Sequence, residues 1–225
     1  MKKVICFFAL SVITIGLLSA CEPVENPNNN LPDIDETKPY YVHMVGAPDF
    51  HGWLDYLQYA RANAETGTED IFVYHKVGSV LDSIDLIKDL IDKKNDDYVN
   101  MIFVGFDAND QEGGSSENAQ SNLDRNKAFV QQLVNSALDK GVILLISNGY
   151  PKTAEETDEH LLWNHEQMAY FITDFMYENY RIYMFNAKRA LGDENEVLKD
   201  ESDEQKFAQL TTDLITYLGL IKKRI

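Results

Sequence analysis

Short apolar runs alternate with longer amphipathic stretches from Tyr40 onward, and this alternation constrains the fold more than any other feature of the sequence. The runs lack the apolar and polar alternation of a strand that has one face in water, so we expect strands buried on both faces. The five expected strands cover residues 40–45, 71–77, 99–106, 142–147 and 180–185.

Helices are expected between and after these strands, where apolar residues recur at helical spacing. The expected helices cover residues 53–64, 80–93, 123–140, 157–179 and 203–218. Gly141 directly follows the third of them and is expected to cap it. Strands separated by helices imply parallel pairing. The prediction for residues 40–225 is therefore an α/β domain, a three-layer α/β/α sandwich with a five-stranded parallel sheet of the flavodoxin-like kind.

The N-terminus carries an export signal. Two lysines precede an apolar run, Val4 to Leu18, which suits the core of a signal peptide and is short for a membrane span. The run ends in Leu18-Ser19-Ala20-Cys21, which resembles the lipobox of bacterial lipoproteins. The resemblance implies that residues 1–20 are removed and that Cys21 is lipidated. An ordinary hydrophobic anchor is the alternative.

A tether is predicted for residues 21–39, which include four of the six prolines and several Asn and Asp residues. Such a composition favours a mobile, semi-extended chain. The lipid would hold the protein at the bacterial cell envelope, on the outer membrane or its periplasmic face. Because Cys6 leaves with the signal and Cys21 takes the lipid, thiol catalysis and cysteine zinc sites are excluded.

Charge excludes another class of function. The chain has 20 Lys and Arg against 37 Asp and Glu, which gives a formal net charge of -17. Nucleic-acid binding requires clustered basic residues, so DNA and RNA are not expected as partners. With 44% hydrophobic residues, the chain can bury a core. The oligomeric state is left open.

The loops after the expected strands resemble those of the SGNH, or GDSL-type, hydrolases over about residues 40–220. Val45-Gly46-Ala47-Pro48-Asp49 stands at the family's first turn, Val77-Gly78-Ser79 at the second and Gly105-Phe106-Asp107-Ala108-Asn109-Asp110 at the third. The resemblance implies an SGNH hydrolase-like fold with its ligand site at the carboxyl ends of the strands. It also implies that Gly78 and Asn109, with Asp110 beside it, line an oxyanion hole.

The catalytic positions depart from the family pattern. Ala47-Pro48-Asp49 occupies the place of the nucleophilic serine, and Asp200-Glu201-Ser202-Asp203 the place of the Asp-x-x-His pair. No histidine follows His165. A serine hydroxyl is a weak nucleophile without a partner base, so the expected Ser-His machinery is missing.

Three residues remain as candidates for relocated chemistry. Ser79 could be a displaced nucleophile or the N-cap of a helix. His51 could orient a ligand, act as a base or simply begin a helix. A water could instead be activated by Asp49 or by His51. His75 lies within a strand and is expected to be a structural histidine.

Metals and cofactors are not expected. The acidic loop from Asp107 to Glu112 fails the calcium-loop pattern, and no His-Glu-x-x-His signature occurs. Aromatic residues near the strand ends would suit stacking on sugar rings, although such residues also form cores. They are Phe50, Trp53, Tyr150 and Trp163.

Three functions are compatible with the sequence. The first is an envelope lipoprotein whose SGNH hydrolase-like domain lacks the Ser-His machinery and binds a glycan or other polar ligand. The second is an active esterase or deacetylase on acylated carbohydrate with relocated catalytic groups. The third is one sugar-binding lobe of the periplasmic-binding-protein type.

Overall fold

The structure is a computed structural model that describes residues 34–35, 37–63, 69–106, 116–147, 159–179, 181–187, 190 and 202–224. Within the helices, residues 48–49, 61–63, 116–118, 159–165, 203 and 222–224 are described by their backbone alone. All described elements belong to one unit, Leu31–Ile225.

One parallel sheet organises this unit. Its strands are β1 (Tyr40–Gly46), β2 (Ile71–Lys76), β3 (Val99–Gly105), β4 (Ile143–Ser147) and β5 (Ile182–Phe185), in the order β2-β1-β3-β4-β5. Every neighbouring pair is parallel. The predicted five-stranded parallel sheet is confirmed. The order is the flavodoxin-like one, whose topological switch point lies between β1 and β3.

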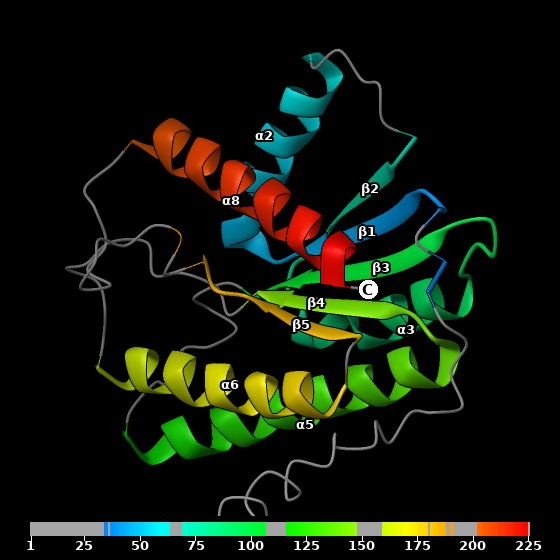
Figure 1. Ribbon diagram of the computed structural model, residues 1–225. Helices are drawn as coiled ribbons and strands as arrows, with labels where there is room; N and C mark the ends of the chain where they lie inside the picture. The colour runs from blue at the N-terminus through cyan, green and yellow to red at the C-terminus, as the bar shows by residue number, and fades with distance from the viewer. Residues whose placement is uncertain are drawn as a thin grey trace, which may run out of the picture. The chain divides into compact units, whose positions relative to one another are not determined.

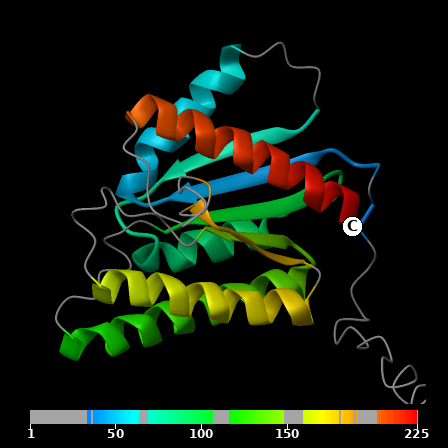
Figure 2. The same cartoon turned by 60° about the vertical axis from the view of Figure 1, so that its left-hand side comes forward.

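Helices cover both faces of the sheet (Figures 1 and 2). On one face lie α2 (Pro48–Asn63) and α8 (Asp203–Arg224). On the other lie the 3-10 turn η1 (Leu81–Ser83) and helices α3 (Ile84–Asp92), α5 (Ser116–Lys140) and α6 (Glu159–Glu178). Each face has its own apolar cluster of strand and helix side chains. The predicted three-layer α/β/α sandwich is confirmed.

Neighbouring residues of a strand point to opposite clusters, and both are buried. On β3, Met101 and Phe103 pack with α2 and α8, whereas Ile102 and Val104 pack with α3, α5 and α6. Burial on both faces explains why the strands read as continuous apolar runs in the sequence.

Gly141 ends α5 as predicted. Its φ of 69° lies in the left-handed region, where glycine carries no Cβ penalty. The N–H of Gly141 donates to the Leu138 carbonyl at 3.2 Å, and the N–H of Val142 donates to the Ala137 carbonyl at 2.9 Å. This pair of bonds is a Schellman motif, which satisfies the last carbonyls of the helix.

Three helix bounds differ from the prediction by five residues or more. Helix α2 begins at Pro48 instead of 53, and α5 begins at Ser116 instead of 123. Proline suits the first helical position because its fixed φ is already helical. Helix α8 continues past Gly219 to Arg224, because Ile221 is buried and extends the apolar stripe.

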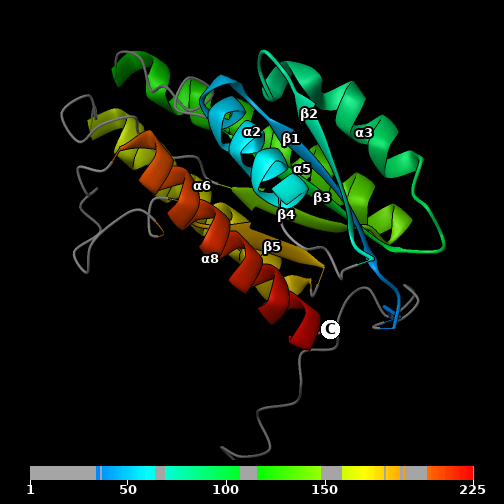
Figure 3. The same ribbon diagram turned by 90° about the horizontal axis from the view of Figure 1, so that it is seen from above.

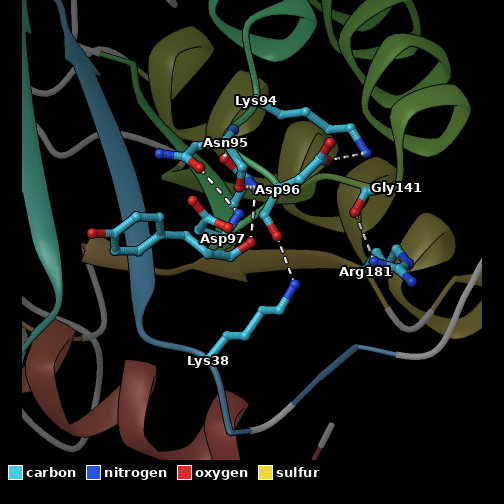
Figure 4. A network of polar contacts seen from close by, with 9 residues as sticks. Lys38, Lys94, Asn95, Asp96, Asp97, Gly141 and Arg181 are labelled. Carbon is cyan, nitrogen blue, oxygen red and sulfur yellow. Dashed lines mark hydrogen bonds and ion pairs between the residues drawn. The ribbon is translucent and has the colours of Figure 1, made fainter.

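The last residues of the predicted tether contact the amino edge of the sheet. Ile34 packs against the apolar cluster beneath α8, and the Lys38 ammonium donates to the Asp96 carbonyl at 2.6 Å (Figure 4). The Val99 N–H donates to the Pro39 carbonyl at 2.9 Å. Lys38 and Pro39 are thus fastened to the start of β3. Among the described residues, no helix is long and apolar enough to cross a bilayer.

Candidate functional site

The candidate site predicted from sequence lies at the carboxyl edge of the sheet, and apolar packing closes the centre of this edge. Ala47, Phe50 and Phe106, which follow β1 and β3, are all 0% exposed. A β-carbon placed on Gly105 would lie 2.5 Å from Cδ1 of Phe50, and one placed on Gly46 would lie 2.9 Å from Cβ of the same residue. The two glycines therefore let the Phe50 side chain lie directly on the strand ends.

Of the two interpretations of Phe50 and Trp53, core packing is confirmed and availability for stacking on sugars is wrong. Both side chains are 0% exposed, and their ring centroids lie 5.1 Å apart. Trp53 also stacks on Phe185 at 5.8 Å, and its indole N–H donates to Thr211 Oγ1 at 3.2 Å. Because α2 begins before Phe50, both residues face the sheet. Tyr150 and the side chain of Trp163 lie outside the described residues.

His51 bonds to the end of the neighbouring strand. Its Nε2 lies 2.8 Å from the Val77 carbonyl oxygen. Because a carbonyl only accepts, Nε2 must carry the proton and donate. The half-buried imidazole thereby ties the first turn of α2 to the residue after β2. This contact matches the structural interpretation of His51 more closely than a role as a base through Nε2.

Ser79 begins the segment that leads into η1. Its Oγ accepts from the Asp82 N–H at 3.4 Å, and its carbonyl accepts from Ser83 Oγ at 2.6 Å. These bonds are those of a serine at a helix start. The hydrogen bonds described at His51 and Ser79 run to other groups, and none of them joins the two residues.

Gly78, the predicted oxyanion-hole glycine, is exposed at the same edge, and a β-carbon there would meet nothing within 4 Å. Several other predicted residues lie outside the description: Cys21, Asn109 and Asp110 entirely, and the Asp49 side chain. In the described part of the chain, no group of three or more potential metal-ligating side chains occurs.

A histidine pair that the sequence did not reveal links β1 to the edge strand β2. His43 Nδ1 lies 3.0 Å from His75 Nε2, and the Tyr41 ring meets His43 edge-on at 4.7 Å. Burial, helped by the nearby His75, lowers the pKa of His43 to about 4, and burial also lowers the pKa of His75. The expectation that His75 is structural agrees with this contact. Only the strand register, which offsets the two histidines by two residues, could have exposed the pair.

No protein-family model matches the sequence, and no curated protein matches it either. Solved structures do match. The acetylxylan esterase Axe2 of Geobacillus stearothermophilus aligns with a TM-score of 0.58 at 10% identity, covering 83% of this chain and 97% of that one. A GDSL-like lipase of Bacteroides thetaiotaomicron aligns at 0.54 and 13% identity, covering 86% and 94%.

The OSK domain of Drosophila Oskar aligns with a TM-score of 0.51 at 14% identity, covering 87% of this chain and 98% of that domain. Sequence identities this low establish the fold alone. The chain therefore has an SGNH hydrolase-like α/β fold, as the residues at its strand ends predicted.

Proposed function

We propose that the protein is a lipid-anchored envelope lipoprotein whose SGNH hydrolase-like domain binds a glycan or other polar ligand and does not hydrolyse esters with a Ser-His pair. The observation that carries this proposal is the closed centre of the carboxyl edge. Ala47, which begins the segment at the family's nucleophile position, is completely buried, and so is Phe50, which directly follows that segment.

The hydrogen bonds of the remaining candidates support binding over catalysis. A general base must accept the proton of the serine hydroxyl through a ring nitrogen with a free lone pair. His51 donates its Nε2 proton to the Val77 carbonyl, so only Nδ1 could act as a base, and no described hydrogen bond joins Nδ1 to a serine hydroxyl. Ser79 already accepts the Asp82 N–H, although at 3.4 Å this bond is long. Each side chain therefore has a structural role that explains its position.

An active esterase is the second candidate, and one observation favours it. Gly78 is exposed, with open space around its α-carbon, next to Ser79 at the edge where such enzymes bind their substrates. One of the similar structures is named as an acetylxylan esterase. The third interpretation, a sugar-binding lobe, stays a prediction.

Ester hydrolysis separates the first two candidates. The mature chain with Cys21→Ala is incubated with 4-nitrophenyl acetate and with acetylated xylo-oligosaccharides. We expect no turnover above the buffer rate, and the same result for Ser79→Ala and His51→Ala. Turnover that disappears in Ser79→Ala, while the thermal midpoint is unchanged, would establish the esterase and refute the binding proposal.

The anchor is tested separately. In the full-length chain, Cys21→Ala removes the thiol that would accept the lipid, so the protein should move from the membrane fraction to the soluble fraction or remain unprocessed. Ser19→Ala keeps a small residue before Cys21 and serves as the control that should stay in the membrane. Metabolic labelling with a radioactive fatty acid should mark the control and leave Cys21→Ala unlabelled.

A further inference from the structure

A groove lies along the edge strand β5, away from the carboxyl edge of β1 and β2. Its described walls come from α6, β5, the residues after β5 and α8, and its cavity volume is about 490 Å³. Figure 3 shows β5 at the border of the sheet with α8 beside it. Volumes of this size are typical of sites for small ligands.

The walls of the groove are mainly apolar. Met176 of α6, Met184 of β5 and Tyr217 and Leu220 of α8 line it. Tyr217 is held in place by Phe185, whose ring centroid lies 6.3 Å away. Leu220 remains 56% exposed at the rim. The groove thus presents a fixed aromatic ring together with flexible thioether side chains, which adapt to a ligand's shape.

Three polar side chains also line the groove, and two of them present hydrogen-bond acceptors. Asp213 Oδ1 accepts from Gln209 Nε2 at 2.8 Å, and no described contact occupies Oδ2. Thr216 Oγ1 donates its proton to the Thr212 carbonyl at 2.9 Å, so its lone pairs remain as acceptors. Asn186 is the third polar residue of the lining.

Charge restricts the ligand further. No lysine or arginine occurs among the described lining residues, and the chain as a whole carries a formal charge of -17. An anionic ligand would be repelled and would find no cationic partner in the groove. The matching ligand is uncharged, offers hydroxyl donors to Asp213, and has an apolar face that can lie on Tyr217.

We propose that the groove between α6, β5 and α8 binds a neutral saccharide. The C–H face of a sugar ring packs on Tyr217, and two of its hydroxyls donate to Asp213 Oδ2 and Thr216 Oγ1. This inference rests on the proposed glycan-binding function and assigns it to a place other than the carboxyl edge of β1 and β2. Hydrogen bonds to a carboxylate are stronger than neutral ones, so Asp213 should contribute most to recognition.

The test uses isothermal titration of the mature Cys21→Ala chain with four probes: xylohexaose, cellohexaose, laminarihexaose and, as an anionic comparison, oligogalacturonate. We expect at least one neutral oligosaccharide to bind and oligogalacturonate to bind more weakly. Asp213→Asn and Tyr217→Ala should each weaken binding by about tenfold or more, whereas Tyr217→Phe should retain it.

Matched controls make the same two kinds of substitution, Asp to Asn and Tyr to Ala, at positions outside the groove. Asp85→Asn on α3 and Tyr59→Ala on α2, both at exposed positions, should leave affinity within about twofold. Circular dichroism and the thermal midpoint of each variant verify folding. If Tyr217→Ala fails to fold, Asp213→Asn decides the outcome.

The outcomes distinguish the groove from the proposed function. Neutral binding that survives Asp213→Asn and Tyr217→Ala, but is lost in Gly78→Val, would overturn the groove and keep a glycan-binding protein. Tighter binding of oligogalacturonate would overturn the class of ligand. No binding of any probe at millimolar concentration would overturn both this inference and the glycan proposal.

Discussion

The carboxyl edge of the central strands and the groove beside β5 differ in how much of their side chains is exposed. At the carboxyl edge, Phe50 lies on Gly46 and Gly105 and is completely buried. Beside β5, Leu220 stays exposed and Asp213 keeps a carboxylate oxygen without a described contact. The turn after β1, where the first motif position lies, is packed, whereas the groove beside β5, which carries no motif, is open.

Within one fold, the position of a sequence motif and the position of an accessible site can therefore differ. A fold fixes where strands end, but function depends on which side chains remain accessible there. In this chain the first turn after β1 serves packing, and accessible acceptors lie beside α8. Substitutions in each region test whether the two regions differ in this way.

The largest effect is expected from Phe50→Ala. Removing a fully buried aromatic side chain should lower the free energy of unfolding by about 3–5 kcal/mol, because it leaves a cavity at the strand ends. Gly105→Ala should also destabilise the wild type, since its β-carbon would lie 2.5 Å from the Phe50 ring. Urea denaturation measures both.

The double variant sharpens this test. In the Phe50→Ala background the clash at Gly105 disappears, so the added cost of Gly105→Ala should fall by at least about 1 kcal/mol. Gly78→Ala, which meets nothing within 4 Å, is the matched control and should change stability by less than about 0.5 kcal/mol. Strictly additive costs would show that Phe50 does not lie on Gly105.

The second effect concerns the other edge strand, β2, which the histidine pair joins to β1. The pKa of His43 is about 4 in the folded chain, against an ordinary value of 6.5. As pH falls below 6.5, His43 takes up a proton in the unfolded chain before it does so in the folded chain. The contribution of His43 to the free energy of unfolding is therefore fully present above pH 6.5 and is lost as the pH falls toward 4. Between pH 7 and pH 5, the titration of His43 should lower the free energy of unfolding by roughly 2 kcal/mol.

Urea midpoints measured from pH 7.5 to 4.5 check this dependence. His43→Gln removes the titrating group, and the difference between wild type and variant isolates it from the carboxylates, which titrate in both. A wild-type curve that parallels the His43→Gln curve over this range would contradict the buried pair. In that case, the side chains that join β2 to β1 would be as open to solvent as those of the groove beside β5.

A smaller effect is expected where α2 crosses α8. A β-carbon on Gly52 would lie 2.8 Å from Cζ of Phe207, so Gly52→Ala should cost about 1 kcal/mol. The half-buried Phe207 ring can move partly aside, which makes this cost smaller than that of Gly105→Ala. In a Phe207→Ala background, Gly52→Ala should instead stabilise α2, because alanine is the better helix former. Thermal unfolding of the wild type, the two single variants and the double variant checks whether the effect of Gly52→Ala on stability changes sign.

The smallest effect is expected at the rim of the groove. Leu220 is 56% exposed, so Leu220→Gln should change the free energy of unfolding by no more than about 0.5 kcal/mol. Leu214, also on α8, is only 2% exposed. Leu214→Gln should therefore be strongly destabilising, and it serves as the contrast. A loss above about 2 kcal/mol for Leu220→Gln would mean that the groove is packed as tightly as the carboxyl edge.

The sheet could be predicted from the sequence because burial on both faces leaves continuous apolar runs, such as Met101 to Val104. The starts of α2 and α5 could not, since the Pro48 and Ser116 segments look like loops when only apolar spacing is considered. Pro48 did carry a signal, because proline favours the first turn of a helix.

The site was less predictable than the sheet. Sequence position correctly placed Gly78 and Ser79 after β2, but it could not say whether Phe50 and Trp53 point outward or into the core. That depends on the phase of α2, which begins five residues earlier than expected. The groove was missed because Met176, Met184 and Tyr217 come from three separate elements and share no local pattern.

The attachment of Lys38 and Pro39 to the start of β3 has a mechanical consequence. Tension on the segment that precedes Ile34 would enter the domain through Pro39 into β1, which has β2 on one side and β3 on the other. A pull along the axis of such an inner strand loads many ladder bonds together, in shear. A pull that peels a strand away from the sheet would instead break these hydrogen bonds one at a time. The unit is therefore built to resist extraction from the end at which an anchor would hold it.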